Sequence, residues 1–190
     1  DDKTYPWVCI KNERFPRILY TRKKINDGSE YLGPFASAYS LKTLLDFIRD
    51  LYPLRTCSLD LSEKNIEAKK FRPCLEFHIG RCKAPCVDKQ QEQEYNENVA
   101  QIRHLLKGNI STVIRSLKEK MNTYSENLQF ELAQMEKEKL IALEKFQGRS
   151  LVVNPSIQDA EVFGMYSSPT SAFVNYFKVT DGSIIQGLTI

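Results

Sequence analysis

Residues 109–147 limit what this chain can fold into more than any other stretch, because they contain neither glycine nor proline. Their apolar residues recur at helical spacing in two stripes: Ile110, Val113, Ile114, Leu117 and Met121, then Phe130, Ala133, Leu140, Leu143 and Phe146. The stripes lose phase around residues 126–128, where we expect a turn. Two antiparallel helices joined by a short turn form a helical hairpin, so the sequence predicts one at 109–147.

Two further helices are predicted before the hairpin. Residues 88–108 have one apolar side and end at Gly108, a residue that commonly stops a helix, so we expect a connecting helix there. Apolar residues also recur at helical spacing from Ser40, which can serve as the cap, to Leu51, just before Pro53.

Both ends of the chain are typical of β-structure. Residues 5–35 predict a three-stranded antiparallel meander, with a turn at Asp27-Gly28. Residues 161–190 predict three more strands, the last two joined at Asp181-Gly182. Because each set is small for a stable sheet, we expect residues 1–54 and 149–190 to build one antiparallel sheet. The predicted fold class is therefore α+β, with residues 55–87 as an inserted cysteine-rich loop and the hairpin projecting from the sheet.

Four of the five cysteines lie in that loop, namely Cys57, Cys74, Cys82 and Cys86. Thiolates are soft, charged ligands, and four of them complete the shell of a zinc ion or an iron–sulfur cluster. The sequence shows no secretory signal, which favours a metal site over disulfides. The alternative is that these are reduced thiols that never meet in space. Cys9 stands apart and is expected to be a buried free thiol.

Positive charge is concentrated in the first half of the chain. Residues 1–86 hold 16 Lys and Arg against 11 Asp and Glu, a net +5, whereas residues 87–190 hold 11 against 13, a net −2. Basic residues beside aromatic ones indicate contact with nucleic acid, although a solvated turn or loop is the alternative. One such group is Arg22, Lys23 and Lys24; the group that we predict to bind DNA is Lys69, Lys70, Arg72, Arg81 and Lys83.

No catalytic constellation is visible in the sequence. It contains no G-x-S-x-G, HExxH or Walker motif, and we interpret Asp159 and Glu161 as a polar strand edge. The chain opens without methionine and ends within an alternating pattern, so we expect a piece of a longer protein, without catalytic residues of its own. No apolar run reaches the length of a membrane helix, and we expect a cytoplasmic location with no membrane partner.

Three stretches together resemble the UvrC family, the excinucleases of bacterial nucleotide excision repair. The first runs from Tyr5 to Arg17 and continues at residues 31–35. The second comprises residues 54–57 and 72–86, which include all four clustered cysteines. The third, residues 127–133, resembles the family's UVR motif. Their order and spacing match over essentially the whole chain.

The resemblance implies a protein that cuts damaged double-stranded DNA on both sides of a lesion. One cut comes from an N-terminal GIY-YIG nuclease domain and the other from a C-terminal ribonuclease-H-like domain, and neither centre lies in this chain. The resemblance also implies an iron–sulfur cluster on the four cysteines, with zinc as the alternative. The predicted sheet would be an inactive ribonuclease-H-like platform.

The resemblance further implies that the hairpin binds the C-terminal UVR hairpin of the partner protein UvrB. We expect Phe130 to be the anchor, with apolar neighbours and a charged rim; the alternative is that Phe130 closes the hairpin's own core. The motif usually contains Ala where this chain has Gln134, and Arg where it has Lys137. Lysine lacks the planar guanidinium group with which arginine forms two parallel hydrogen bonds. The predicted partner-binding residues are Leu128, Phe130, Glu131, Ala133, Lys137 and Glu138.

Two other functions are compatible with the residues. One is a stand-alone metal-binding module that uses the hairpin for dimerisation, and the other is a fragment that itself hydrolyses nucleic acid. Binding to UvrB separates the first from the UvrC interpretation, and an incision assay tests the second.

Overall fold

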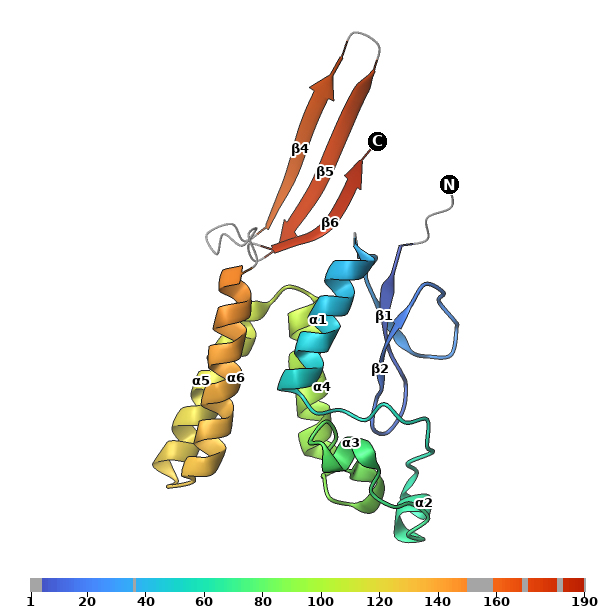
Figure 1. Cartoon of the computed structure of the whole chain (residues 1–190), viewed down its shortest axis with the longest axis vertical. Coiled ribbons are helices and arrows are strands. Elements are labelled where there is room, and N and C mark those ends of the chain that lie inside the picture. The colour runs from blue at the N-terminus through green and yellow to red at the C-terminus, as the bar shows by residue number, and fades with distance from the viewer. Residues whose placement is uncertain (1–4, 36, 150–158, 169–170, 181–182, 190) are drawn as a thin grey trace. The chain divides into compact units, whose positions relative to one another are not determined.

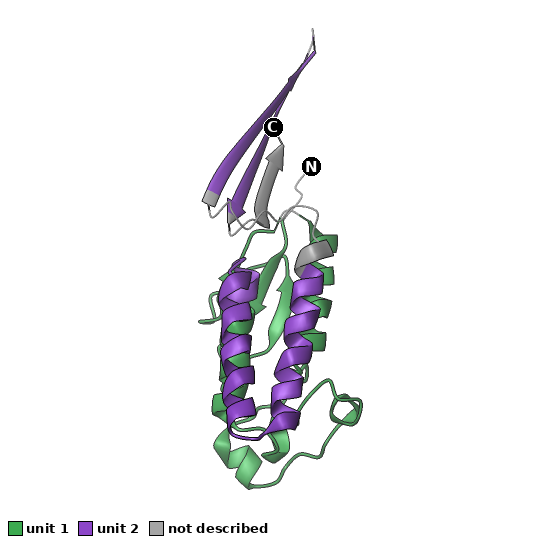
Figure 2. Ribbon diagram, turned by 90° about the vertical axis from the view of Figure 1, so that its left-hand side faces the viewer, with its two compact units in different colours: residues 1–102 green, residues 103–190 purple. Residues whose placement is uncertain are grey.

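The computed structural model describes residues 5–35, 37–149, 159–168, 171–180 and 183–189. The chain forms two compact units, residues 1–102 and 103–190 (Figure 2). The described residues contain six α-helices, a short 3₁₀ helix and two small antiparallel sheets (Figure 1), which confirms the α+β class. None of the helices among these residues is long and apolar enough to span a bilayer.

The first sheet is built around its most apolar strand. Strand β1 (Trp7–Ile10) lies between β2 (Ile18–Thr21) and β3 (Glu30–Leu32), and both neighbours run antiparallel to it. Val8, Cys9 and Ile10 are buried, as expected for Cys9, whereas β2 and β3 are only half-buried. A strand that buries its side chains gains most at the centre of a sheet, where both of its edges are also hydrogen-bonded.

The predicted meander is therefore wrong in its pairing, because β2 and β3 do not pair with each other in the described sheet. The chain after β2 instead crosses to the far edge of β1. Asp27 in this connection accepts a hydrogen bond from Lys11, which follows β1, and Gly28 adopts a φ of 76°. The Asp-Gly pair lies in a bend of this crossing loop and not in the tight hairpin turn that the sequence predicted.

Helix α1 (Ala38–Leu51) follows the first sheet. Its cap is Ser37 and not Ser40, since the Ser37 hydroxyl accepts the Ser40 N–H at 3.2 Å. The predicted apolar stripe does face the core, with Leu41, Leu45, Ile48 and Leu51 all buried.

Short helices occupy the cysteine-rich stretch, namely α2 (Glu63–Glu67), α3 (Leu75–His78) and the 3₁₀ helix η1 (Pro85–Val87). The longer helix α4 (Glu92–Leu106) comes next and stops before Gly108, whose φ is 84°, as predicted.

The tip of the 11–17 loop packs on α4. Tyr95 is fully buried, and its hydroxyl donates to the Pro16 carbonyl at 3.0 Å. Its ring also meets Phe15 edge-on, with 5.3 Å between centroids. These contacts attach the first sheet to α4 within the first unit.

The helical hairpin is confirmed. Helices α5 (Ile110–Glu126) and α6 (Phe130–Arg149) pack against each other, and the turn lies at 127–129, where Leu128 has a φ of 58°. The buried residues of the hairpin are Ile110, Val113, Leu117, Ala133, Leu140 and Leu143.

The second sheet is a regular meander of β4 (Asp159–Ser167), β5 (Ala172–Thr180) and β6 (Ser183–Thr189). These strands match the prediction; the Asp181-Gly182 turn lies outside the described residues. The prediction of one sheet built from both ends of the chain is wrong, since the described strands form two separate sheets. Short local connections pair neighbouring strands first, and β2 and β3 already occupy both edges of β1.

Candidate functional site

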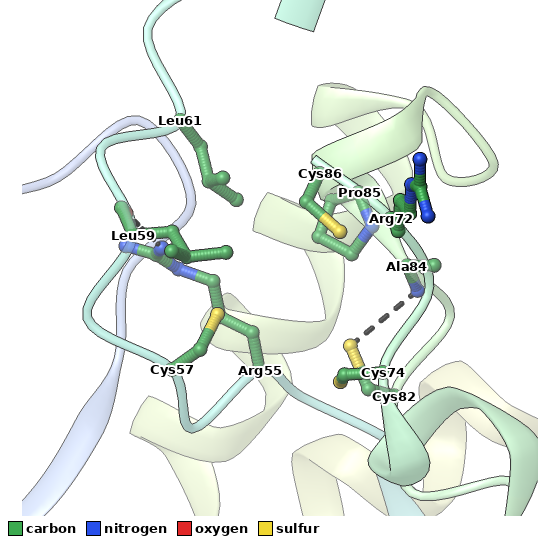
Figure 3. A pocket seen from close by; sticks show the side chains of 10 residues that line it. All are labelled: Arg55, Cys57, Leu59, Leu61, Arg72, Cys74, Cys82, Ala84, Pro85 and Cys86. Atoms are coloured by element: carbon green, nitrogen blue, oxygen red, sulfur yellow. Dashed lines mark hydrogen bonds between the residues drawn. The ribbon is translucent and has the colours of Figure 1, made fainter. Parts of the chain in front are cut away.

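All four clustered cysteines line one cavity of about 50 Å³ (Figure 3). Cys57 comes from the extended segment after α1, and Cys74 precedes the first residue of α3. Cys82 follows α3, and Cys86 lies within η1. Residues 17, 8 and 4 positions apart in sequence are thereby brought to a common space by the folding of the loop around α3.

The loop that carries Cys82 and Cys86 is held by backbone hydrogen bonds. The N–H groups of Arg81 and Cys82 both donate to the Glu76 carbonyl, at 2.8 and 3.0 Å. Ala84 has a φ of 53°, a left-handed conformation, and its N–H donates to Cys82 Sγ at 3.4 Å. The backbone therefore places a donor on a sulfur atom, which is a favourable contact for a thiolate.

The surroundings of the cavity disfavour four free thiolates. Burial raises the pKa of Cys82, although the Ala84 N–H opposes the shift. Burial also raises the pKa of Cys86, and the charges of Cys57 and Cys74 add to it. Because ionised thiols at one cavity repel one another, a bound cation is what would stabilise them as thiolates.

The cavity suits a thiolate-ligated group by its chemistry. Its lining has no carboxylate; besides the cysteines it consists of Arg55, Leu59, Leu61, Arg72, Ala84 and Pro85. In the part of the chain that the structure describes, no three His, Cys, Asp or Glu side chains come together closely enough to hold a single ion. A cluster with several iron atoms gives each thiolate its own iron and so accepts more widely spaced ligands than one zinc ion.

Arg55 is a site residue that the sequence analysis missed. Its side chain is only 3% exposed and reaches the cavity wall. Nε donates to the Phe15 carbonyl at 2.8 Å, Nη1 donates to the Leu59 carbonyl at 2.7 Å, and Nη2 pairs with Glu13. The residue stands two positions before Cys57, but a single arginine in a basic half of the chain gives no sign that it is buried.

Glu13, which is half-buried, completes this group of charged residues. Its carboxylate accepts hydrogen bonds from Arg17 Nε at 3.0 Å and Nη2 at 2.6 Å, besides the one from Arg55. The hydrogen bond from Arg17, together with the charge of Arg55, lowers the pKa of the Glu13 carboxyl. The 13–17 loop and the segment after α1 are thus joined through Arg55 at the edge of the cavity.

The predicted DNA-binding residues differ in their availability. Lys69, Lys70, Arg72 and Arg81 are exposed, and Arg72 also lines the cysteine cavity. Lys83 is half-buried and forms an ion pair with Glu94 at 2.6 Å, so its charge is largely neutralised.

The predicted partner-binding residues gather at the turn of the hairpin and the start of α6. Leu128 is 74% exposed and Phe130 is 61% exposed, so Phe130 does not close the hairpin's own core. Ala133 is buried between the helices, which leaves it little surface for a partner. Glu131, Lys137 and Glu138 are exposed. Leu132 and Met135, which the sequence analysis did not single out, add further exposed apolar surface to this first part of α6.

Comparison with known proteins agrees with these features. Residues 5–105 match the family described as UvrC/Cho excinuclease, middle domain, and residues 111–146 match the UvrB/uvrC motif. The second match covers both helices of the hairpin. No solved structure matches the chain.

The chain is also similar to longer proteins that carry the same name. The chain is 49% identical to UvrABC system protein C of Flavobacterium johnsoniae, over 100% of this chain and 32% of that protein. It is 46% identical to the protein of that name in Bacteroides thetaiotaomicron, over 100% of this chain and 31% of that protein. It therefore spans about a third of the length of these relatives. The match over residues 5–105 shows that the chain belongs to the UvrC/Cho excinuclease middle-domain family.

Proposed function

We propose that this chain is the non-catalytic central segment of the UvrC subunit of a bacterial nucleotide excision repair endonuclease. In this role it binds UvrB through the hairpin and supports incision on both sides of damaged DNA by nuclease domains outside the segment. The observation that carries the proposal is the match to the UvrB/uvrC motif, which falls on a hairpin with an exposed apolar tip.

The tip has the properties of a helix-docking surface. Leu128 and Phe130 expose most of their side chains to solvent, which is costly unless a partner covers them. Glu131, Lys137 and Glu138 are exposed on the first part of α6 and carry both signs of charge. Charges at the rim of an interface fix the orientation of a partner more than its affinity. We assign the C-terminal UVR hairpin of UvrB as that partner, because the motif that this hairpin matches is described for both UvrB and UvrC.

Substitution of Phe130 tests this role. Phe130→Ala should weaken binding of the UvrB C-terminal hairpin by about 2 kcal/mol, roughly thirtyfold, in a calorimetric titration. The melting temperature of the variant should stay within about 1 °C of the unaltered chain, since the side chain is mostly exposed. Ile141→Ala is the matched control, because Ile141 is a comparably exposed apolar residue three turns further along α6. Unchanged affinity of a folded Phe130→Ala variant would remove the tip from the interface.

The second part of the proposal concerns the cysteine cavity. Cys57, Cys74, Cys82 and Cys86 would hold an iron–sulfur cluster, with zinc as the alternative, and the cluster would tie the loop to α3 and η1. Arg55 and Arg72 would offset the negative charge of the thiolates. Iron, sulfide and zinc analysis of anaerobically purified protein decides between the two.

The remaining parts concern DNA and catalysis. Lys69, Lys70, Arg72 and Arg81 would contact the backbone of damaged duplex DNA, with Lys83 contributing less because Glu94 holds it. The purified chain should not nick DNA in magnesium or manganese; cleavage lost on a point mutation within it would contradict this. Strands β4–β6 would begin an inactive ribonuclease-H-like platform, and the protein would act in the cytoplasm.

A further inference from the structure

The first unit carries a group of cations that form no ion pair with a carboxylate among the residues that the structure describes. Several cations of this unit are ion-paired: Lys11 with Asp27, Arg14 with Glu92, Arg17 and Arg55 with Glu13, Arg49 with Asp46, and Lys83 with Glu94. Within the described residues, Arg22, Lys23, Lys24 and Lys42 have no such partner. Their charge is therefore available to an anionic ligand.

Three of these cations, Arg22, Lys24 and Lys42, contact aromatic side chains. Lys24 Nζ lies 3.3 Å from the centroid of the Trp7 ring, and Lys42 Nζ lies 5.6 Å from that of Tyr20. Arg22 Nε donates to the Tyr20 hydroxyl at 3.1 Å. A cation over a ring is attracted by the ring's quadrupole but keeps its full charge, unlike a cation paired with a carboxylate. The rings thus position the charges without neutralising them.

The segment that carries the cations is fixed at both ends. The Lys23 N–H donates to Thr21 Oγ1 at 3.1 Å, and the same hydroxyl donates to the Lys23 carbonyl at 2.8 Å. Further on, the Ile25 N–H donates to the Tyr31 hydroxyl at 3.0 Å. A ligand that binds here would not have to order the backbone first, so less conformational entropy opposes binding.

An exposed aromatic residue lies beside this group. Tyr39 is 81% exposed and precedes Lys42 by three residues on α1, so their side chains are neighbours on the helix surface. An unpartnered ring next to free cations is the combination that binds an unpaired base together with its phosphate. A membrane surface would instead require a continuous apolar face on an amphipathic helix.

We infer that these residues form a second nucleic-acid contact, which binds single-stranded DNA. The contact, called here the β2–α1 patch, consists of Trp7, Tyr20, Arg22, Lys23, Lys24, Tyr39 and Lys42. It is separate from the loop residues 69–83 to which the proposed function assigns duplex contact, and it requires neither metal nor UvrB. The cations bind phosphates, and Tyr39 stacks on one base.

Charge removal provides the first test. The whole chain is titrated against a fluorescein-labelled oligothymidine of about 20 nucleotides, followed by anisotropy at several salt concentrations. Replacing Arg22, Lys24 and Lys42 together by Gln should weaken binding at least tenfold. It should also make the slope of log K against log salt less negative by about 2, which is 0.7 for each of the three lost phosphate contacts. Arg49→Gln is the matched control on α1, because Asp46 already neutralises that charge, and it should change affinity less than about twofold.

Tyr39 provides a second test that does not alter charge. Tyr39→Ala should weaken binding about tenfold, whereas Tyr39→Phe should bind as the unaltered chain does, because a phenyl ring still stacks. Neither change should move the melting temperature, since the side chain is exposed. Equal loss in both variants would overturn the stacking role.

Three results would overturn the patch itself. One is the absence of measurable binding by the unaltered chain at low salt, and another is binding to phosphatidylglycerol vesicles in preference to DNA. The third is a loss of oligothymidine affinity that occurs only in a loop variant, in which Lys69, Lys70 and Arg72 are replaced by Gln. In that last case the proposed duplex contact stands and the patch fails, whereas a loss confined to the patch variant supports the patch and not the loop.

Discussion

Replacing Arg55 by methionine should destabilise the first unit by about 3 kcal/mol. Loss of a partner from a buried ion pair costs about 3–5 kcal/mol. We take the lower end because Glu13 is half-buried and keeps its bonds to Arg17. The Phe15 and Leu59 carbonyls also lose their donors, which adds about 2 kcal/mol. Burial of the methionine side chain offsets about 2 kcal/mol of the lost stability, which leaves about 3 kcal/mol.

The chain offers a specific probe for the measurement. Trp7 is its only tryptophan and lies in β1, so its fluorescence reports on unfolding of the first unit. Urea titrations should give a lower midpoint for Arg55→Met with an unchanged slope, because the surface exposed on unfolding stays the same.

Arg49→Met is the matched control. Arg49 pairs with Asp46 at 3.3 Å, but both side chains are at least half exposed, and such pairs contribute less than about 1 kcal/mol. An Arg55→Met variant that loses no more stability than this control would refute the claim that buried hydrogen bonds of Arg55 join the 13–17 loop to the segment before Cys57.

Three further predictions concern the same unit. Because folding lowers the pKa of Glu13, its stabilising effect is complete above the pKa that Glu13 has in the unfolded chain and is lost as pH falls through its pKa in the folded chain. The urea midpoint of Glu13→Gln should therefore fall less between about pH 6 and pH 3 than that of the unaltered chain. This range brackets the ordinary glutamate pKa of about 4.3. Tyr95→Phe leaves the Pro16 carbonyl without its donor and should lower the free energy of unfolding by about 1–2 kcal/mol in the same assay, with an unchanged midpoint as the contrary result. Cys74→Ser should reduce the metal content of anaerobically purified protein, whereas Cys9→Ser, which alters a thiol in β1, should not; equal metal content in both variants would exclude Cys74 as a ligand.

The exposed tip of the hairpin separates what the sequence predicts from what only the packing of the helices shows. The periodicity of apolar residues predicted the two helices and the turn near residue 128, because apolar residues on one face of a helix recur three and four positions apart. It also put Phe130 in the apolar stripe with Ala133, and only the packing of α5 on α6 shows that Ala133 is buried while Phe130 stays exposed. Sequence spacing shows which residues share a face of a helix, but it does not show which part of that face the partner helix covers.

What the sequence by itself determined about this protein is local: the long helices α1, α4, α5 and α6, the Gly108 stop, the turn of the hairpin and the strands of β4–β6. Each depends on residues a few positions apart, whose conformational preferences and spacing are readable directly. Only the tertiary structure decided that β3 pairs with β1 across a crossing loop, that Arg55 is buried, and that four cysteines line one cavity. These features join residues far apart in sequence, and they form because the core buries β1 at the centre of its sheet and the loop folds around α3.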